Sequence, residues 1–145
     1  MIVAPLSKRV IAFSIDEAVS VTLFVVVLFA IDEPELVAAA QSGNNLEIQK
    51  VVSKFLMQYV VIKFLYHTIF VYLYGATLGK LAVKIYCVRA DGSSMDIATA
   101  AIRAAVRLIS EMIFYMGFLV ALFTNSRQSL HDMAAKTLVV EIEKE

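Results

Sequence analysis

Two long apolar stretches constrain this chain more than any other feature of its sequence. One runs over residues 10–31 and the other over residues 51–76. At ~1.5 Å of rise per residue, a helix over either stretch covers the ~30 Å hydrocarbon core of a bilayer. The sequence therefore predicts two transmembrane helices, joined by an outer loop over residues 32–50. Asp16 and Glu17 lie inside the first stretch and argue against a cleaved signal peptide there.

The composition supports a membrane protein and excludes several other classes. Hydrophobic residues make up 60% of the chain, above the share of about half that is usual in soluble proteins. Thirteen basic and thirteen acidic residues cancel, so the basic surplus of a nucleic-acid-binding protein is missing. A single cysteine, Cys87, and two histidines cannot build a disulfide framework or a structural zinc site. We expect no metal, no cofactor and no nucleic-acid partner.

Charged residues beside the apolar stretches predict the orientation of the chain. Lys8 and Arg9 precede the first stretch, whereas the segment from Asp32 to Gln49 carries acidic residues and no basic one. Three basic residues follow the second stretch: Lys80, Lys84 and Arg89. Cytoplasmic loops carry an excess of lysine and arginine. We therefore expect a multi-pass protein of the cytoplasmic (inner) membrane, with its amino terminus and residues 77–96 in the cytoplasm.

A small β element is predicted outside the apolar stretches. Residues 81–94 are rich in β-branched and aromatic side chains and end at an Asp-Gly turn signal, and residues 137–143 in the tail over residues 124–145 have the same character. An isolated strand is unstable, so the economical arrangement pairs these two segments on the cytoplasmic face. That pairing requires an even number of membrane crossings between them.

The third hydrophobic segment, residues 97–123, is apolar only in its second half, because its first half carries Arg103, Arg107 and Glu111. One interpretation is a helical hairpin, with an interfacial helix whose arginines reach lipid headgroups and a short re-entrant return. The other is a plain third span with the tail outside. The expected fold is thus an all-α membrane protein in a single domain over residues 1–145, with a two-stranded cytoplasmic β element.

Ionisable residues inside the predicted spans are the first candidates for function, because a charge at the bilayer centre costs ~2.5–3.5 kcal/mol on insertion scales. Asp16 shares a helix face with Arg9, two turns away, and Ala12 between them leaves a narrow groove for another element. Lys63 and His67 share a face of the second helix. We expect Asp16 to face Lys63 and His67. Glu17 is a further candidate.

Several short motifs together resemble the RDD family of small membrane proteins. They are KRVIAFSID, the turn GATLGK, the strand that ends in Asp-Gly, the helix AAIRAAVRLI and the tail RQSLHDMAAKTLVV. The resemblance covers nearly the whole chain, and the arginine and two aspartates of the family name correspond to Arg9, Asp16 and Asp132. At Lys136 the family more often has glycine, and this departure weakens the expectation of a close backbone approach there.

The resemblance implies that the cytoplasmic tail completes a polar cluster. Asp132 would meet Arg9 at the mouth of the groove, which would place a buried arginine between two aspartates. Arg127 and His131 are secondary candidates in the same tail. We expect these three groups, Arg9, Asp16 and Asp132, to converge.

Two functions are compatible with these features, and neither is enzymatic, because no nucleophile arrangement or phosphate-binding loop is present. In the first, the protein is a small transporter or cation/proton exchanger subunit, in which Asp16 binds a proton or a monovalent cation. Because the chain is short, that role needs a homo-oligomer or a partner membrane protein. In the second, it is a non-transporting interaction or assembly module in the lipid bilayer, and the cluster is structural.

Overall fold

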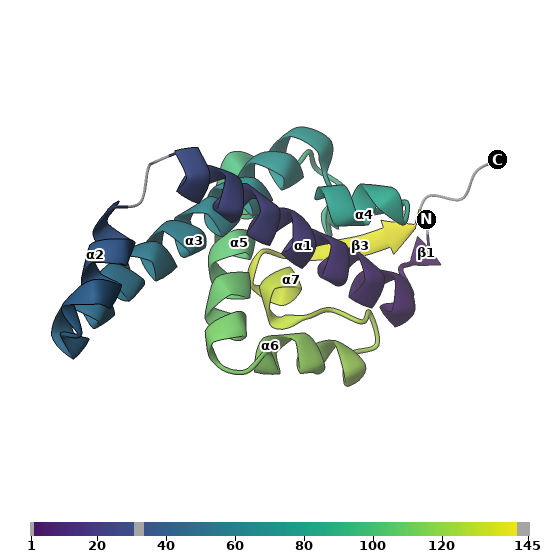
Figure 1. The fold of residues 1–145 in the computed structure, drawn as a ribbon. Helices are drawn as coiled ribbons and strands as arrows, with labels where there is room; N and C mark the ends of the chain where they lie inside the picture. The colour runs from purple at the N-terminus through teal and green to yellow at the C-terminus, as the bar shows by residue number, and fades with distance from the viewer. Residues whose placement is uncertain (1, 31–33, 142–145) are drawn as a thin grey trace.

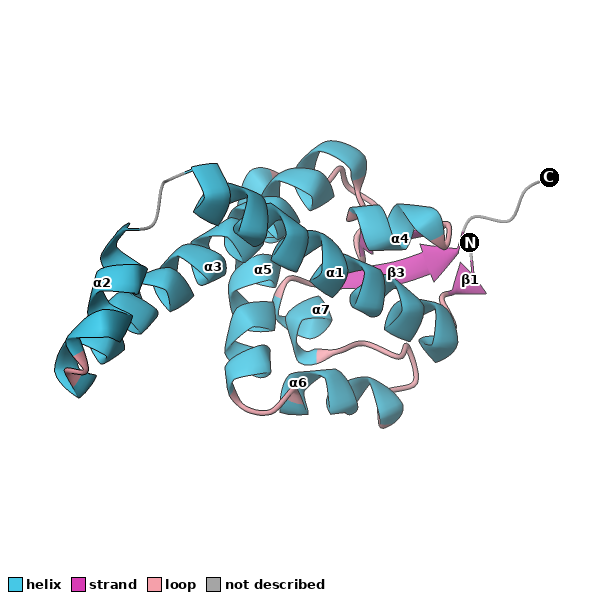
Figure 2. Ribbon diagram, in the orientation of Figure 1, coloured by secondary structure: helices cyan, strands magenta, loops and turns pink. Residues whose placement is uncertain are grey.

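The computed structural model describes residues 2–30 and 34–141. It is mostly helical, with a small antiparallel sheet at one end (Figures 1 and 2). In chain order the elements are β1 (Ile2–Val3), α1 (Leu6–Ala30), α2 (Pro34–Ser42), α3 (Asn45–Tyr74), α4 (Leu78–Ala82), β2 (Ile85–Arg89), α5 (Ile97–Met112), α6 (Met116–Leu119), the 3-10 helix η1 (Val120–Leu122), α7 (Leu130–Ala134) and β3 (Thr137–Glu141).

Helices α1 and α3 are each long and apolar enough to cross a membrane, as the sequence predicts. Helix α1 begins at Leu6, four residues before the predicted start, and Ile31 lies outside the described residues. Helix α3 ends at Tyr74 and is capped by Gly75, which adopts a left-handed φ of 66° that glycine accepts without steric cost. Large apolar side chains along both helices are exposed, as lipid-facing residues are: Val10, Val26, Phe29, Leu56 and Leu73.

The predicted outer loop over residues 32–50 is wrong in its central part, because α2 occupies Pro34–Ser42 and α3 already begins at Asn45. The Asn44 side chain accepts a hydrogen bond from the Leu46 backbone N–H and caps α3 six residues before the predicted start. Helix α2 packs against α3, and an ion pair of 2.6 Å joins Lys54 to Glu35. Asp32 and Glu33 lie outside the described residues.

The sheet confirms the predicted pairing of two distant segments and adds a strand. Strand β2 pairs antiparallel with β3, with Arg89 opposite Thr137, and β1 pairs with the other edge of β3. The sequence prediction missed β1, which is only two residues long. It also began the strand that corresponds to β2 too early, at Leu81 and Ala82, which belong to α4. Glu143, the last residue of the predicted second strand, lies outside the described residues.

Strands of one sheet must lie on the same side of a membrane, and α2 lies at the opposite end of the long helices (Figure 1).

The third hydrophobic segment bends sharply rather than continuing as one straight helix. Helix α5 and the following α6 and η1 segment meet at an angle of 110°. The reversal uses two residues with left-handed φ, Phe114 and Tyr115. Gly117 then lies directly against α5, where an added Cβ would be 2.1 Å from the Ser110 hydroxyl. This geometry disfavours a plain straight third span.

Candidate functional site

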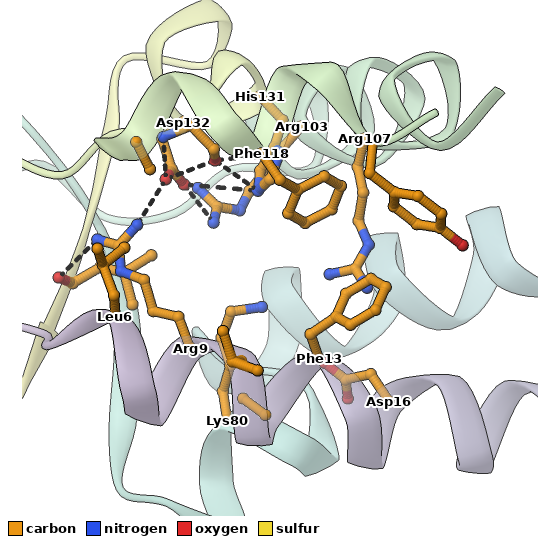
Figure 3. A pocket seen from close by; sticks show the side chains of 16 residues that line it. Leu6, Arg9, Phe13, Asp16, Lys80, Arg103, Arg107, Phe118, His131 and Asp132 are labelled. Atoms are coloured by element: carbon orange, nitrogen blue, oxygen red, sulfur yellow. Dashed lines mark hydrogen bonds and ion pairs between the residues drawn. The ribbon is translucent and has the colours of Figure 1, made fainter. Parts of the chain in front are cut away.

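Asp132 lies at the centre of a buried ion-pair cluster. Its side chain is fully buried, and Arg9 Nη1 donates to Asp132 Oδ2 at 3.1 Å. Arg103 Nη2 lies 2.5 Å from Asp132 Oδ1, and the backbone N–H and hydroxyl of Ser129 also donate to Oδ2 at 3.0 and 2.8 Å (Figure 3). The predicted contact of Arg9 with Asp132 is confirmed. The prediction that one arginine lies between two aspartates is wrong. Instead, one aspartate, Asp132, lies between two arginines, Arg9 and Arg103.

The charges in this cluster shift the pKa values of the tail residues. Burial by itself raises the pKa of Asp132, but the charges of Arg103 and Arg9 and the hydrogen bond from the Ser129 backbone hold it well below its usual range. Burial lowers the pKa of His131 well below its ordinary value, and Asp132 opposes this shift only in part. The carboxylate is therefore ionised and the imidazole neutral near pH 7.

Asp16 belongs to a second cluster that does not include Arg9 or Asp132, so the predicted convergence of all three groups is wrong. Its buried carboxylate accepts hydrogen bonds from three donors, which are the Tyr66 hydroxyl at 2.8 Å, the Thr77 hydroxyl at 2.6 Å and the Gly79 backbone N–H at 2.9 Å. These donors come from α3, from the residue before α4 and from α4 itself. Asp16 thereby joins α1, α3 and α4.

Helix α4 fills the groove that the sequence predicts beside Ala12. The backbone of Gly79 lies so close to α1 that an added Cβ would be 2.1 Å from the Ala12 carbonyl oxygen and 2.8 Å from Asp16 Oδ1. Only glycine allows this approach, which brings its N–H to the carboxylate. The turn motif GATLGK, which holds Thr77 and Gly79, was visible in the sequence, but its hydrogen bonds to Asp16 were not predicted.

Lys63 forms a third cluster, inside the helical bundle. Its ammonium group lies 2.7 Å from Glu17 Oε1 and 2.5 Å from Glu111 Oε2. Arg107 Nε donates to Glu111 Oε1 at 3.1 Å, and its Nη2 lies 3.7 Å from Glu17. The prediction that Asp16 faces Lys63 is therefore wrong, because the neighbouring Glu17 takes that position.

The arginines of α5 point into the protein rather than toward lipid headgroups. Arg103 and Arg107 are both buried, because α5 turns its polar face toward α3 and α7. Their spacing of four residues, followed by Glu111 four residues later, marks one helix face in the sequence. That spacing identified the face but not its partners, Lys63 and Asp132.

Three other residues singled out in the sequence, His67, Arg127 and Lys136, form none of the ion pairs described above. His67 is buried beside the Tyr66 ring, and its Nε2 has no hydrogen-bond partner among the described residues. Arg127 is exposed, and none of the described ion pairs involves it. Lys136 has a φ of 51°, in the left-handed region that favours glycine, so a glycine at this position would adopt the observed backbone at less steric cost.

A cavity of about 240 Å³ lies between α1 and the segment from α5 to α7 (Figure 3). Its polar lining includes both aspartates of the first two clusters and four cationic side chains: Arg9, Lys80, Arg103 and Arg107. Apolar walls include Phe13 and Phe118, whose ring centroids lie 5.2 and 5.5 Å from the Arg107 guanidinium carbon. Within the described residues, no group of three or more histidine, cysteine, aspartate or glutamate side chains could hold a metal ion.

Comparison with known families gives one clear result. The model of the RDD family matches residues 3–136, which include every described cluster above. No match was found among curated proteins or among solved structures. With its apolar helices and nearly complete family match, the chain is a membrane protein that belongs to the RDD family.

Proposed function

We propose that this protein is a non-transporting interaction or assembly module of the membrane, in which the arginine and the two aspartates of the family name are structural. The observation that carries the proposal is the set of hydrogen bonds to Asp16. Its Oδ1 accepts from the Tyr66 hydroxyl and the Gly79 backbone N–H, and its Oδ2 accepts from the Thr77 hydroxyl. Most acceptor sites of this carboxylate are thus used to hold helices together, which favours a structural role over binding and release of ions.

The Asp132 cluster supports the same interpretation. It links α1 through Arg9, α5 through Arg103 and the tail through Ser129. Arg103 also donates to the Thr137 hydroxyl, at the start of β3. A buried ion pair that joins four elements restrains their relative positions, and removal of one partner leaves an uncompensated buried charge.

The topology that fits this assembly has two crossings, by α1 and α3, with the bent segment from α5 to η1 returning to the side of the sheet. Basic residues near the sheet and acidic residues near α2 support a cytoplasmic position for the sheet under the charge rule. We propose the cytoplasmic (inner) membrane as the location. The exposed apolar faces of α1 and α3 contact lipid, and they also suit a second copy or a partner membrane protein.

Ion flux tests the proposal. The wild-type protein in proteoliposomes, with an imposed sodium or potassium gradient and a pH-sensitive dye inside, is expected to move protons no faster than empty liposomes. A cation-dependent proton flux clearly above that of empty liposomes would contradict the proposal.

A second candidate function is cation/proton exchange at the Lys63 cluster. Here two carboxylates, Glu17 and Glu111, contact one ammonium group between α1, α3 and α5, and Glu17 remains one quarter exposed. If flux is observed, Glu17→Gln should abolish it while Glu35→Gln, on the exposed helix α2, should leave it unchanged. Equal flux in both variants would remove this candidate.

A further inference from the structure

The cavity beside the Asp132 cluster has more positive than negative charge. Four cationic side chains line it, against two carboxylates. Asp132 contacts two of these cations, Arg9 and Arg103, whereas Asp16 accepts hydrogen bonds from neutral donors. Within the described residues, the other two cations, Lys80 and Arg107, form no ion pair with a carboxylate of the cavity wall. Arg107 contacts Glu111, which does not line the cavity.

Lys80 is the less compensated of the two. Its side chain is only 7% exposed, and among the residues that the structure describes its amine donates only to the Thr77 hydroxyl, at 3.4 Å. No carboxylate of the described residues forms an ion pair with it. Burial lowers the pKa of Lys80, because the charged ammonium loses its hydration. An anion in the cavity would restore the lost stabilisation of the charged form.

Arg107 is held in place but keeps donors free. Its Nε donates to Glu111, and its guanidinium lies over the rings of Phe13 and Phe118. Its Nη2 is buried without a hydrogen-bond partner in the described part of the chain, since Glu17 Oε1, at 3.7 Å, is too far for a hydrogen bond. The guanidinium and the Lys80 amine point into the same open space (Figure 3). A fixed guanidinium with unused donors is suited to a phosphate or another oxyanion.

The rest of the cavity wall indicates what is attached to the anion. Besides the aromatic rings it includes Leu6, Val10 and Ala121. Val10 is also strongly exposed on the outer surface of α1, in a helix that crosses the membrane. A ligand with a charged head and a hydrocarbon part would contact both kinds of wall.

We propose that this cavity binds a phosphate group, with Lys80 and Arg107 as its charged partners and with the apolar wall against an attached hydrocarbon chain. Two sources can supply the group, an anionic phospholipid of the surrounding bilayer or a free phosphate. The apolar wall favours the phospholipid. Removal of one charge-assisted contact should weaken binding by at least about tenfold.

Thermal unfolding of the full chain in a neutral detergent tests the proposal. Phosphatidylglycerol should raise the melting temperature more than phosphatidylcholine with the same acyl chains. Lys80→Met should need at least about ten times more phosphatidylglycerol for the same rise, whereas Lys84→Met, an exposed lysine, should respond like the wild type. A Lys80-dependent rise with inorganic phosphate alone would support the site and assign it to the free anion.

Three results would overturn the proposal: no rise with either phosphatidylglycerol or inorganic phosphate, an equal rise with the two lipids, or an unchanged response of Lys80→Met. If Lys80→Met does not fold, lipid binding by the wild-type protein still tests the proposal. Native mass spectrometry after incubation with equal amounts of the two lipids should show one preferentially retained phosphatidylglycerol. Equal retention would contradict the site.

Discussion

Arg9 donates a hydrogen bond of 3.1 Å to Asp132, a residue 123 positions away in the sequence. Arg9 also donates to the Val139 carbonyl oxygen in β3 at 3.3 Å. The start of the first span, the short helix α7 and the last strand are thereby fixed to one another. The tail is thus an integral part of the fold over its described residues, which end at Glu141.

Asp132→Asn should destabilise the protein strongly. The change leaves Arg9 and Arg103 buried without their counter-charge, which costs ~3–5 kcal/mol of unfolding free energy. Thermal and denaturant unfolding in one detergent measure it. Asp91→Asn makes the same chemical change at an exposed site and should have little effect. Equal effects of the two substitutions would contradict the structural role of Asp132.

Gly79→Ala should also destabilise the protein, because the new Cβ would lie 2.1 Å from the Ala12 carbonyl oxygen. Separation of α4 from α1 would weaken the Gly79 hydrogen bond to Asp16. We expect a loss of at least ~1–3 kcal/mol. Gly92→Ala is the control, since nothing lies within 4 Å of its added Cβ and only its positive φ is strained. A loss no larger than that of the control would show that α4 tolerates displacement.

The buried His131 should make stability depend on pH. Its pKa in the folded protein lies well below the ordinary value of 6.5, so the unfolded chain binds a proton first as the pH falls. This contribution to stability is complete above about pH 6.5 and is lost progressively below it. The melting temperature of His131→Gln should therefore fall less between pH 7.5 and pH 5 than that of the wild type. Parallel pH profiles would contradict the buried neutral state.

The sheet should lie on one side of the membrane and α2 on the other. In a Cys87→Ser background, single cysteines at Ser42 and Ser93 should be labelled from opposite sides by an impermeant reagent in intact cells. Ser42 is expected to react from outside and Ser93 only after permeabilisation. A cysteine at residue 145 should be labelled only after permeabilisation, like the cysteine introduced at Ser93. External labelling at residue 145 would restore a third full span.

The sequence predicted the large-scale features because they depend on local patterns. Length and apolar character identified both spans, and β-branched runs identified the two main strands. The start of α1 was displaced, because Leu6 extends the helix through polar residues that hydropathy does not detect. The helix α2 was missed because acidic residues in a short segment resemble a solvated loop.

The site was harder to predict because its contacts join distant elements. The contact of Arg9 with Asp132 came from family resemblance and not from spacing. The partners of Asp16 depend on the close approach at Gly79, a property of packing that a single sequence does not display. Likewise, the stripe of Arg103 and Arg107 marked a polar face, but that face could have turned to headgroups or to buried carboxylates.

The most direct test of the structural role assigned to the polar residues is the change in melting temperature caused by Asp16→Asn. A buried carboxylate whose role is to bind an ion lacks charge and hydrogen-bond partners when no ion is bound. Its neutralisation should therefore leave the stability of the protein unchanged or raise it. Asp16 instead accepts three hydrogen bonds, and an amide would turn a donor toward one of those donors. The expected result is a loss of ~1–3 kcal/mol and a lower melting temperature in detergent. A melting temperature equal to or above that of the wild type would contradict it.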